Sequence, residues 1–425
     1  MNRFIPMVWC TATALAAATS SAAPAAGRSL QEEPLELRQA VALALQHQPM
    51  LEAISAEAQA ARHAAISAEQ LPDPQLFAGI RDLAIDTDDA YSFTRDSDTQ
   101  LIIGVMQEFP RAQKRRLRGQ QRSARAERLD FESALTERVI RRDVSLGWLA
   151  LWREARAQHV AAASLGQGRT QAQAVENSFS SGRSTESDAV AARIEVERLE
   201  DEVAKGAQAV ASARHTLRRW IGGAAERPVV EDLPPFSPPP DRGELVAHLS
   251  GHPELQVLEA RIDEANVNAD LARAAYQPDW RVELGYGHRP EFSEMVMLQV
   301  GLDLPLFTGN RQDRDLDRAL ALGAAARAAW EDGRRRLESE ALLLRDDLDR
   351  LSTRATRYND TILPQTGTRI DAALAAWRSG RGTLTQVLES RRSRLEMELV
   401  SLDLLHDVAK RHVELAYLTV EGTPR

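Results

Sequence analysis

The chain has 425 residues, of which 43% are hydrophobic and 27% charged, but aromatic residues make up only 5%. Compact enzyme cores rely on aromatic side chains for buried area, whereas helical seams filled with Ala and Leu do not. The formal net charge is −9, from 53 basic and 62 acidic residues, which disfavours nucleic acid as a partner. The composition therefore favours extended helical architecture.

The N-terminus predicts a secretory signal peptide, which we assign to residues 1–26. Arg3 precedes an apolar stretch that runs from residue 4 to about residue 18, and small residues follow it up to a cleavage choice at Ala26. The alternative is an uncleaved anchor. The lone Cys10 lies inside the apolar stretch, next to a tryptophan that does not suit lipidation. We therefore expect a mature chain without cysteine that leaves the cytoplasm.

Proline placement predicts very long helices. No proline lies between Pro110 and Pro228, and Pro364 alone lies between Pro305 and Pro424. Because proline breaks helix interiors, stretches without it can hold helices far longer than globular proteins use. We expect long helices over about 111–221 and about 309–420.

Heptad spacing of apolar residues within these blocks predicts coiled-coil seams. His406 lies on the second stripe, where a core or groove histidine is expected rather than a metal ligand. The seam residues are Val196, Val203, Val210 and Leu217 with Leu199, Gly206 and Ala213 in the first block, and Leu388, Leu395, Leu402, Ala409 and Ala416 with Leu399, His406, Val413 and Val420 in the second.

Four short segments alternate between apolar and polar or small residues, as half-exposed strands do. Trp280, Val282 and Leu284, for example, alternate with polar neighbours. A length of about ten residues suits a membrane-spanning strand, and a soluble hairpin is the alternative. The predicted strands are about 76–85, 99–109, 280–289 and 295–304. The polar face carries the candidate barrel-lumen residues Arg281, Glu283, Gln299 and Asp303, for which simple water-facing polarity is the alternative.

The chain also repeats itself at an interval of roughly 200 residues. Gln48-Pro49-Met50-Leu51 corresponds to His252-Pro253-Glu254-Leu255, and Phe179-Ser180-Ser181-Gly182-Arg183 corresponds to Trp377-Arg378-Ser379-Gly380-Arg381. A Pro-rich stretch separates the copies and predicts a stiff, extended linker. We assign a first structural repeat to 27–226, the connector to 227–243 and a second structural repeat to 244–425.

Four strands per chain are too few to close a barrel, and open sheet edges cannot face lipid. Closure would therefore require several chains. A symmetric trimer would supply about twelve strands, which lies within the bacterial range.

Three motifs carry a resemblance to a known family. They are Leu71-Pro72-Asp73-Pro74, then Gln107-Glu108-Phe109-Pro110 followed by Lys114-Arg115-Arg116, and Leu304-Pro305-Leu306-Phe307 followed by Gly309-Asn310-Arg311. In this order and spacing the chain resembles the TolC-type outer-membrane efflux factors over nearly its whole mature length. The first two motifs are most similar to the heavy-metal, CzcC-like branch.

The resemblance implies a mainly α-helical homotrimer. Its strands form one 12-stranded β-barrel in the outer membrane, and its helical hairpins form a periplasmic α-barrel. It implies no catalytic residue and no cofactor. The expected partners are a periplasmic adaptor (membrane fusion) protein, an inner-membrane pump of the resistance-nodulation-division type and outer-membrane lipid. The expected function is a passive efflux duct, with heavy-metal cations as the candidate cargo. The alternatives are the duct of a type I protein secretion system and a periplasmic coiled-coil scaffold.

The resemblance also maps two hairpin tips that point toward the adaptor. The candidate contacts there are Gly182, Arg183, Gly380 and Arg381. The candidate gate residues just inside the tips are Glu186, Asp188, Gln386 and Glu389. Rings of acidic side chains select cations in narrow pores. The alternative is that these acids only complement a helix dipole and that the arginines are solvated tip charges.

No other segment predicts a chemical site. The aspartates between the first two strands lack calcium-loop spacing, which favours an ordinary solvated loop. The sequence has no H-E-x-x-H, G-x-S-x-G or P-loop motif. We therefore predict no enzyme activity, cofactor or tight metal site. The loop aspartates are Asp86, Asp88, Asp89, Asp96 and Asp98.

Overall fold

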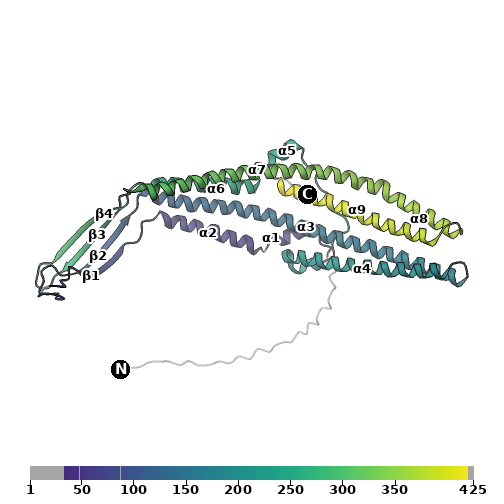
Figure 1. The fold of residues 1–425 in the computed structure, drawn as a ribbon, viewed down its shortest axis with the longest axis horizontal. Helices are drawn as coiled ribbons and strands as arrows, with labels where there is room; N and C mark the ends of the chain where they lie inside the picture. The colour runs from purple at the N-terminus through teal and green to yellow at the C-terminus, as the bar shows by residue number, and fades with distance from the viewer. Residues whose placement is uncertain (1–32, 47, 87, 420–425) are drawn as a thin grey trace, which may run out of the picture.

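The structure, a computed structural model, describes residues 33–46, 48–86 and 88–419. The predicted signal peptide, residues 1–26, lies outside this part of the chain. The molecule is elongated, with a sheet at one end and two helical hairpin turns at the other (Figure 1). Its elements are α1 (Leu37–Gln46), α2 (Pro49–Glu69), β1 (Gln75–Arg81), β2 (Gln100–Phe109), α3 (Ala112–Ser180), α4 (Glu186–Ile221), α5 (Arg242–Leu249), α6 (Pro253–Ala274), β3 (Trp280–His288), β4 (Met295–Leu302), α7 (Gln312–Arg357), α8 (Leu363–Arg378) and α9 (Leu384–Leu418).

The four strands form one antiparallel sheet in the order β1-β2-β3-β4. The central pair joins strands from the two halves of the sequence, since residues 101–109 of β2 pair with the whole of β3. At the helix end of this pair the rings of Phe109 and Trp280 stack with centroids 4.2 Å apart. The expected combination of long helical hairpins with a small four-stranded antiparallel sheet is confirmed.

The strands are shorter than the sequence predicts. β1 ends at Arg81 instead of at residue 85, because Asp82 adopts a φ of 56° that an extended strand cannot continue. β4 ends at Leu302 instead of at residue 304, and one further bond, from the backbone N–H of Asp303 to the carbonyl of Asp279 at 2.9 Å, continues its register with β3.

The long helices fill the two proline-poor blocks. α3 runs for 69 residues without a break, which at about 1.5 Å per residue spans about 100 Å. The second block differs, because a π-helical turn at Tyr358–Ile362 separates α7 from α8 just before Pro364. No helix within the described ranges combines the length and apolarity needed to cross a membrane.

The predicted seams are the packed surfaces of α4 and α9. Leu199, Val210 and Leu217 are buried on α4, and Gly206 lets that helix approach Gln158 of α3 closely. The residues buried on α9 are Leu395, Leu402, Ala409 and Val413. Heptad spacing thus identified the faces that hold the hairpins together.

The largest hydrophobic core lies midway along the molecule and includes the Pro-rich connector. Trp148 of α3 is fully buried and donates to the carbonyl of Leu35, and Trp152 donates to the carbonyl of Glu231, both at 2.9 Å. Phe236 of the connector packs against the same core. The connector thus packs against the core, and residues 242–243, which we assigned to it from the sequence, belong to α5.

Candidate functional site

One face of the sheet is apolar and exposed. Leu76, Val105, Leu284 and Leu298 are register partners across all four strands, so their side chains share a face. Their exposed fractions are 73%, 44%, 55% and 69%. Monomeric soluble proteins rarely expose so continuous an apolar surface, because it is costly in water. This face therefore requires an apolar environment.

The opposite face gathers the candidate lumen residues at the helix end of the sheet. Arg281 Nη1 bonds Asp303 Oδ1 at 3.1 Å, and Arg281 Nε lies 3.7 Å from Glu283 Oε1. Glu283 and Gln299 are register partners. The structure thus brings all four residues together, with charges of both signs.

Toward the outer loops this face combines large apolar side chains with the polar side chains of Arg81 and Gln100. Phe77 lies against Gly104, Met297 lies against Gly285, and the side chain of Arg81 contacts the sulfur of Met297. The outer part of this face therefore carries large side chains beside the glycines that alternate along the strands. The glycines leave space that the large side chains of neighbouring strands fill.

The two hairpin tips are built alike. Gly182 and Gly380 both have a φ of 70°, a left-handed conformation that favours glycine. The backbone N–H of Arg183 donates to the carbonyl of Ser178 at 2.8 Å, and that of Arg381 donates to Ala376 at 2.9 Å. Each arginine also donates from Nε to a nearby serine hydroxyl. The backbones of these candidate contact residues therefore close the turn itself.

Capping boxes begin the helices that follow the tips. Thr185 accepts from the backbone of Asp188, and Asp188 Oδ2 accepts from the Thr185 hydroxyl at 2.7 Å and from its N–H at 3.2 Å. In the second hairpin Thr383 and Gln386 form the same box. The hydrogen bond from the Thr185 hydroxyl is the main cause that lowers the pKa of Asp188, against a smaller opposing effect of burial.

Asp188 and Gln386 are thus structural equivalents, one charged and one neutral. Asp188 is half-buried, whereas Glu186 and Glu389 are exposed. In the described part of the chain no hydrogen bond or ion pair joins Asp188 to Glu389. Within one chain Asp188 therefore caps α4. Of the candidate gate residues beside the second tip, Glu389 is the acidic one, and its side chain is exposed.

A buried carboxylate deeper in the hairpins was missed by sequence analysis. Glu195 of α4 is 8% exposed and pairs with Arg198 at 2.6 Å and with Arg392 of α9 at 2.8 Å. Burial raises its pKa, but the hydrogen bonds from the two arginines outweigh that effect and hold the pKa below its usual value. The sequence could have indicated this burial, because Glu195 is spaced three residues from Ala192 and four from Leu199 and so lies on the buried face of α4.

This ion-pair cluster lies beside a cavity of about 230 Å³ between the two hairpins. Arg391 of α9 crosses to Gln167 of α3 at 3.0 Å, parallel to the contact between Arg392 and Glu195. Closer to the tips, a small hydrophobic cluster of Val175, Ala189, Ala192 and Leu384 joins the hairpins. Polar and apolar contacts together hold the two tips side by side.

Lys114, which lies in the second family motif but received no role from the sequence, fixes the junction between sheet and helices. Its side chain is 10% exposed, and Nζ donates to the Gln277 carbonyl at 2.6 Å and to Asp279 Oδ2 at 2.9 Å. Asp279 also accepts from the backbone N–H of Arg111 at 3.0 Å. Burial raises the pKa of Asp279, but Lys114 and Arg111 outweigh it, so the pKa lies below its usual range.

The remaining sequence candidates form no metal cluster in the described ranges, where no group of three or more His, Cys, Asp and Glu residues could hold an ion. His406 is partly buried 3.5 Å from Asp407, and burial lowers its pKa. In the outer loop Asp89 pairs with Arg95, and Asp96 accepts from the Thr99 hydroxyl.

Solved outer-membrane channels have the same fold as this chain. The outer membrane protein VceC of Vibrio cholerae matches 90% of the chain and 95% of its own length at 18% identity, with a TM-score of 0.74. CusC matches 94% and 95% at 15% identity, with a TM-score of 0.77. The Campylobacter jejuni CmeC outer membrane channel matches 90% and 85% at 11% identity, with a TM-score of 0.76. No protein-family profile and no curated protein matches the sequence.

Proposed function

We propose that this protein is an outer-membrane channel of the TolC type, the passive exit duct of a tripartite efflux system. The observation that carries the proposal is the sheet, whose one face is apolar and exposed while its two edge strands, β1 and β4, each have a strand partner on one side only. The shared fold with outer-membrane channels supports it.

Such a sheet cannot enter lipid as a single chain. Unpaired backbone groups at its edges would each cost several kcal/mol in hydrocarbon. Pairing of β4 in one copy with β1 in the next satisfies both edges, and three copies give a barrel of about twelve strands. We therefore propose a homotrimer in the outer membrane. The apolar face meets lipid, the face with Arg281 and Glu283 lines the lumen, and the long helices extend into the periplasm.

The hairpin tips are the proposed contacts for a periplasmic adaptor, which links the channel to an inner-membrane pump of the resistance-nodulation-division type. Arg183 and Arg381 present charge there, on turns fixed by Gly182 and Gly380. The duct carries no catalytic group in this proposal, and the pump supplies the energy. The test is co-purification of a crosslinked adaptor with the wild-type chain and its loss in an Arg183→Glu, Arg381→Glu variant.

The tips also hold the proposed periplasmic gate. In a trimer Asp188 and Glu389 each form a ring of three carboxylates, with Glu186 nearby, and the capping hydrogen bonds lower the pKa of Asp188 further below its usual value. Gln386 leaves the equivalent position of the second hairpin neutral. Single-channel recordings of an Asp188→Asn, Glu389→Gln variant should show weaker cation preference. Unchanged selectivity would exclude these residues as the gate.

We propose heavy-metal cations as the cargo. The acidic residues just inside the tips and the resemblance of the first two motifs to the heavy-metal branch both support this. Deletion should then lower growth in Zn²⁺, Co²⁺ or Cd²⁺ while leaving growth in hydrophobic drugs unchanged. Sensitivity to drugs alone, or loss of a secreted protein, would reassign the cargo.

Adjacent residues on opposite faces of β4 allow a sharp test of the channel itself. Leu298→Asp places a charge on the proposed lipid face, where a carboxylate in hydrocarbon is destabilising, whereas Gln299→Asp changes the proposed lumen face. Heat-resistant trimers in isolated outer membranes should disappear for Leu298→Asp and persist for Gln299→Asp. Equal assembly of both variants, or a wild-type chain that stays soluble without detergent, would contradict the proposal.

A further inference from the structure

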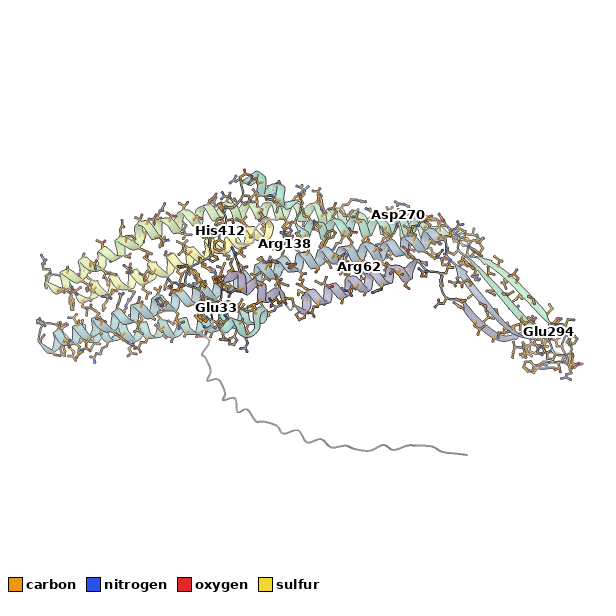
Figure 2. The ribbon with its side chains drawn as sticks, turned by 180° about the vertical axis from the view of Figure 1, so that it is seen from behind. Glu33, Arg62, Arg138, Asp270, Glu294 and His412 are labelled. Atoms are coloured by element: carbon orange, nitrogen blue, oxygen red, sulfur yellow. The ribbon has the colours of Figure 1, made fainter. Side chains whose placement is uncertain are left out.

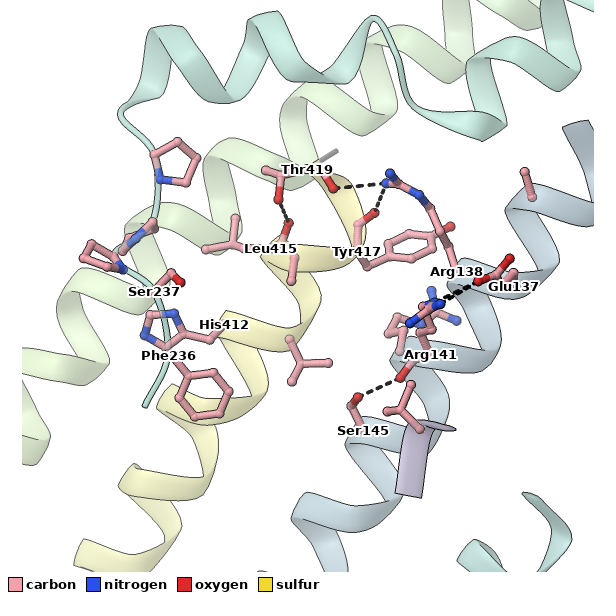
Figure 3. A pocket seen from close by; sticks show the side chains of 18 residues that line it. Glu137, Arg138, Arg141, Ser145, Phe236, Ser237, His412, Leu415, Tyr417 and Thr419 are labelled. Atoms are coloured by element: carbon pink, nitrogen blue, oxygen red, sulfur yellow. Dashed lines mark hydrogen bonds and ion pairs between the residues drawn. The ribbon is translucent and has the colours of Figure 1, made fainter. Parts of the chain in front are cut away.

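A cavity of about 390 Å³ opens near the middle of the molecule, far from the sheet and from the hairpin tips. It lies between α3, the C-terminal end of α9 and the Pro-rich connector (Figure 3). Figure 2 labels Arg138 and His412, two of its wall residues, on the helical shaft. Its volume falls within the range of small-molecule sites, so it can hold a compact organic ligand.

One wall is basic. Arg138 lies about one helical turn from Arg141 and Arg142 on the same side of α3, and Glu137 is the one acidic residue in the lining that the structure describes. Arg141 pairs with Glu137 at 2.6 Å. The ion-pair partner of Arg142 is Asp143, which is not part of the lining. The wall therefore carries an excess of positive charge.

Arg138 is the most constrained of the three. Its Nη1 donates to the carbonyls of Tyr417 and Thr419, both at 3.1 Å, at the end of α9. A guanidinium has five N–H donors, so this contact leaves donors on the other nitrogens. Burial is the main cause that lowers its pKa, Tyr417 and Glu137 oppose that effect, and the nearby charge of Arg141 adds to it. A positive group under such crowding is stabilised by a nearby anion.

The facing wall is flat and apolar. Phe236 of the connector stacks on His412 of α9 with centroids 5.0 Å apart and planes 9° apart. Burial, together with the charge of Arg345, lowers the pKa of His412, so the ring is neutral at neutral pH. The guanidinium of Arg142 lies 4.6 Å from the centroid of the Tyr417 ring. Prolines 238–240 complete this side.

We propose that this cavity binds a small organic anion in which a carboxylate or phosphate group is joined to a flat apolar body. Arg138 and Arg141 bind the anionic group, because guanidinium donors match the geometry of such oxygens. Phe236, His412 and Tyr417 contact the apolar body. The site does not depend on the channel function, and it ties α3, α9 and the connector together when it is filled.

The test uses 2-naphthoate as the probe and equilibrium dialysis against the detergent-solubilised full chain, with protein-free micelles as the blank. Saturable binding of one molecule per chain is the expected result. Two partial probes separate the chemistry: 2-naphthol lacks the anion, and inorganic phosphate lacks the ring. Each should bind at least about tenfold more weakly.

Variants locate the site. Arg141→Gln should weaken 2-naphthoate binding about tenfold, because it removes a charge-assisted contact. Arg169→Gln is the matched control, since Arg169 is also an ion-paired α3 residue, with Glu200 at 2.7 Å, but lies outside the cavity. Binding to that control should equal that of the wild type. His412→Ala tests the apolar wall independently, should Arg141→Gln fail to fold.

Four results would overturn the proposal. They are absence of saturable 2-naphthoate binding at millimolar concentration, equal affinity for 2-naphthol, equal affinity for phosphate alone, and wild-type affinity in both Arg141→Gln and His412→Ala. Equal affinity for 2-naphthol would indicate simple partition of the ring, and equal affinity for phosphate would indicate a plain anion site.

Discussion

The two helical hairpins resemble each other at their tips and differ along their shafts. Gly182 and Gly380 have the same left-handed φ, and the same backbone hydrogen bonds follow each of them. Along the shaft, α3 is continuous, whereas the second hairpin is interrupted by a π turn before Pro364. A tight turn between two helices requires a left-handed glycine and a fixed set of backbone hydrogen bonds, so the two tips are alike. A long helix can contain a local irregularity where its neighbours pack against it.

The π turn has an identifiable cause. Proline has no N–H to donate, and its ring clashes with the carbonyl four residues earlier, so the preceding turn must widen. The widened turn gains a contact of its own, because the Ser401 hydroxyl of α9 donates to Asn359 at 2.9 Å. The second hairpin therefore has a defined irregularity that the first lacks.

The largest effect is expected from a substitution in the ion-pair cluster of Glu195, Arg198 and Arg392, which joins the two hairpins. Glu195→Ala should lower the free energy of unfolding by about 2 kcal/mol, because it leaves Arg198 and Arg392 without their shared partner. The figure is below that for a fully buried pair, since Arg392 is 47% exposed. Thermal unfolding of the solubilised protein measures the loss.

The neighbouring exposed residue provides the control for that change. Glu197→Ala should leave the melting temperature within about one degree of wild type, as surface substitutions usually do. Equal melting temperatures for Glu195→Ala and Glu197→Ala would show that the ion pairs of Glu195 do not stabilise the contact between the two hairpins.

Substitution of the tip glycines tests whether the two turns are energetically equivalent. Gly182→Val and Gly380→Val should each cost about 1–2 kcal/mol, because a β-branched residue is strained at a φ of 70°. Space is not the limit, since a Cβ at either position would meet nothing within 4 Å. Local amide exchange at each tip measures the effect. Asn tolerates this conformation better, so Gly→Asn should cost less, and a Val variant as protected as wild type would contradict the assignment.

The smallest expected effect is a pH dependence of the first tip alone, because Asp188 can titrate and the equivalent Gln386 cannot. The folded-state pKa of Asp188 lies below its usual value of 3.8, so its stabilising contribution is present above that value and is lost as pH falls below it. Between pH 5 and pH 3, the first tip should lose protection from amide exchange by about 0.3–1 kcal/mol more than the second, where Gln386 does not titrate. The exchanged pair Asp188→Gln, Gln386→Asp should move this pH dependence to the second tip. A pH dependence that stays in the first tip would assign it to another group.

The local features of this protein were readable from sequence because their causes are local. Heptad spacing identified Leu199, Leu217 and Leu402 as packing residues, since a 3.5-residue period fixes one face of a helix. The glycines at 182 and 380 marked the turns, because a Cβ is disfavoured there. Alternation identified the strands but overran their ends, because Asp82 turns away through a backbone conformation that hydrophobicity does not encode.

Tertiary structure alone decided which of these elements meet. The pairing of β2 with β3, the burial of Glu195 between α4 and α9, the contact of Lys114 with Asp279 and the arginine-lined cavity all join residues far apart in the chain. The sequence pattern determines which face of an element is apolar, since side-chain direction follows a fixed period. It does not determine which distant face packs against it, because that depends on the shape and charge of both partners at once.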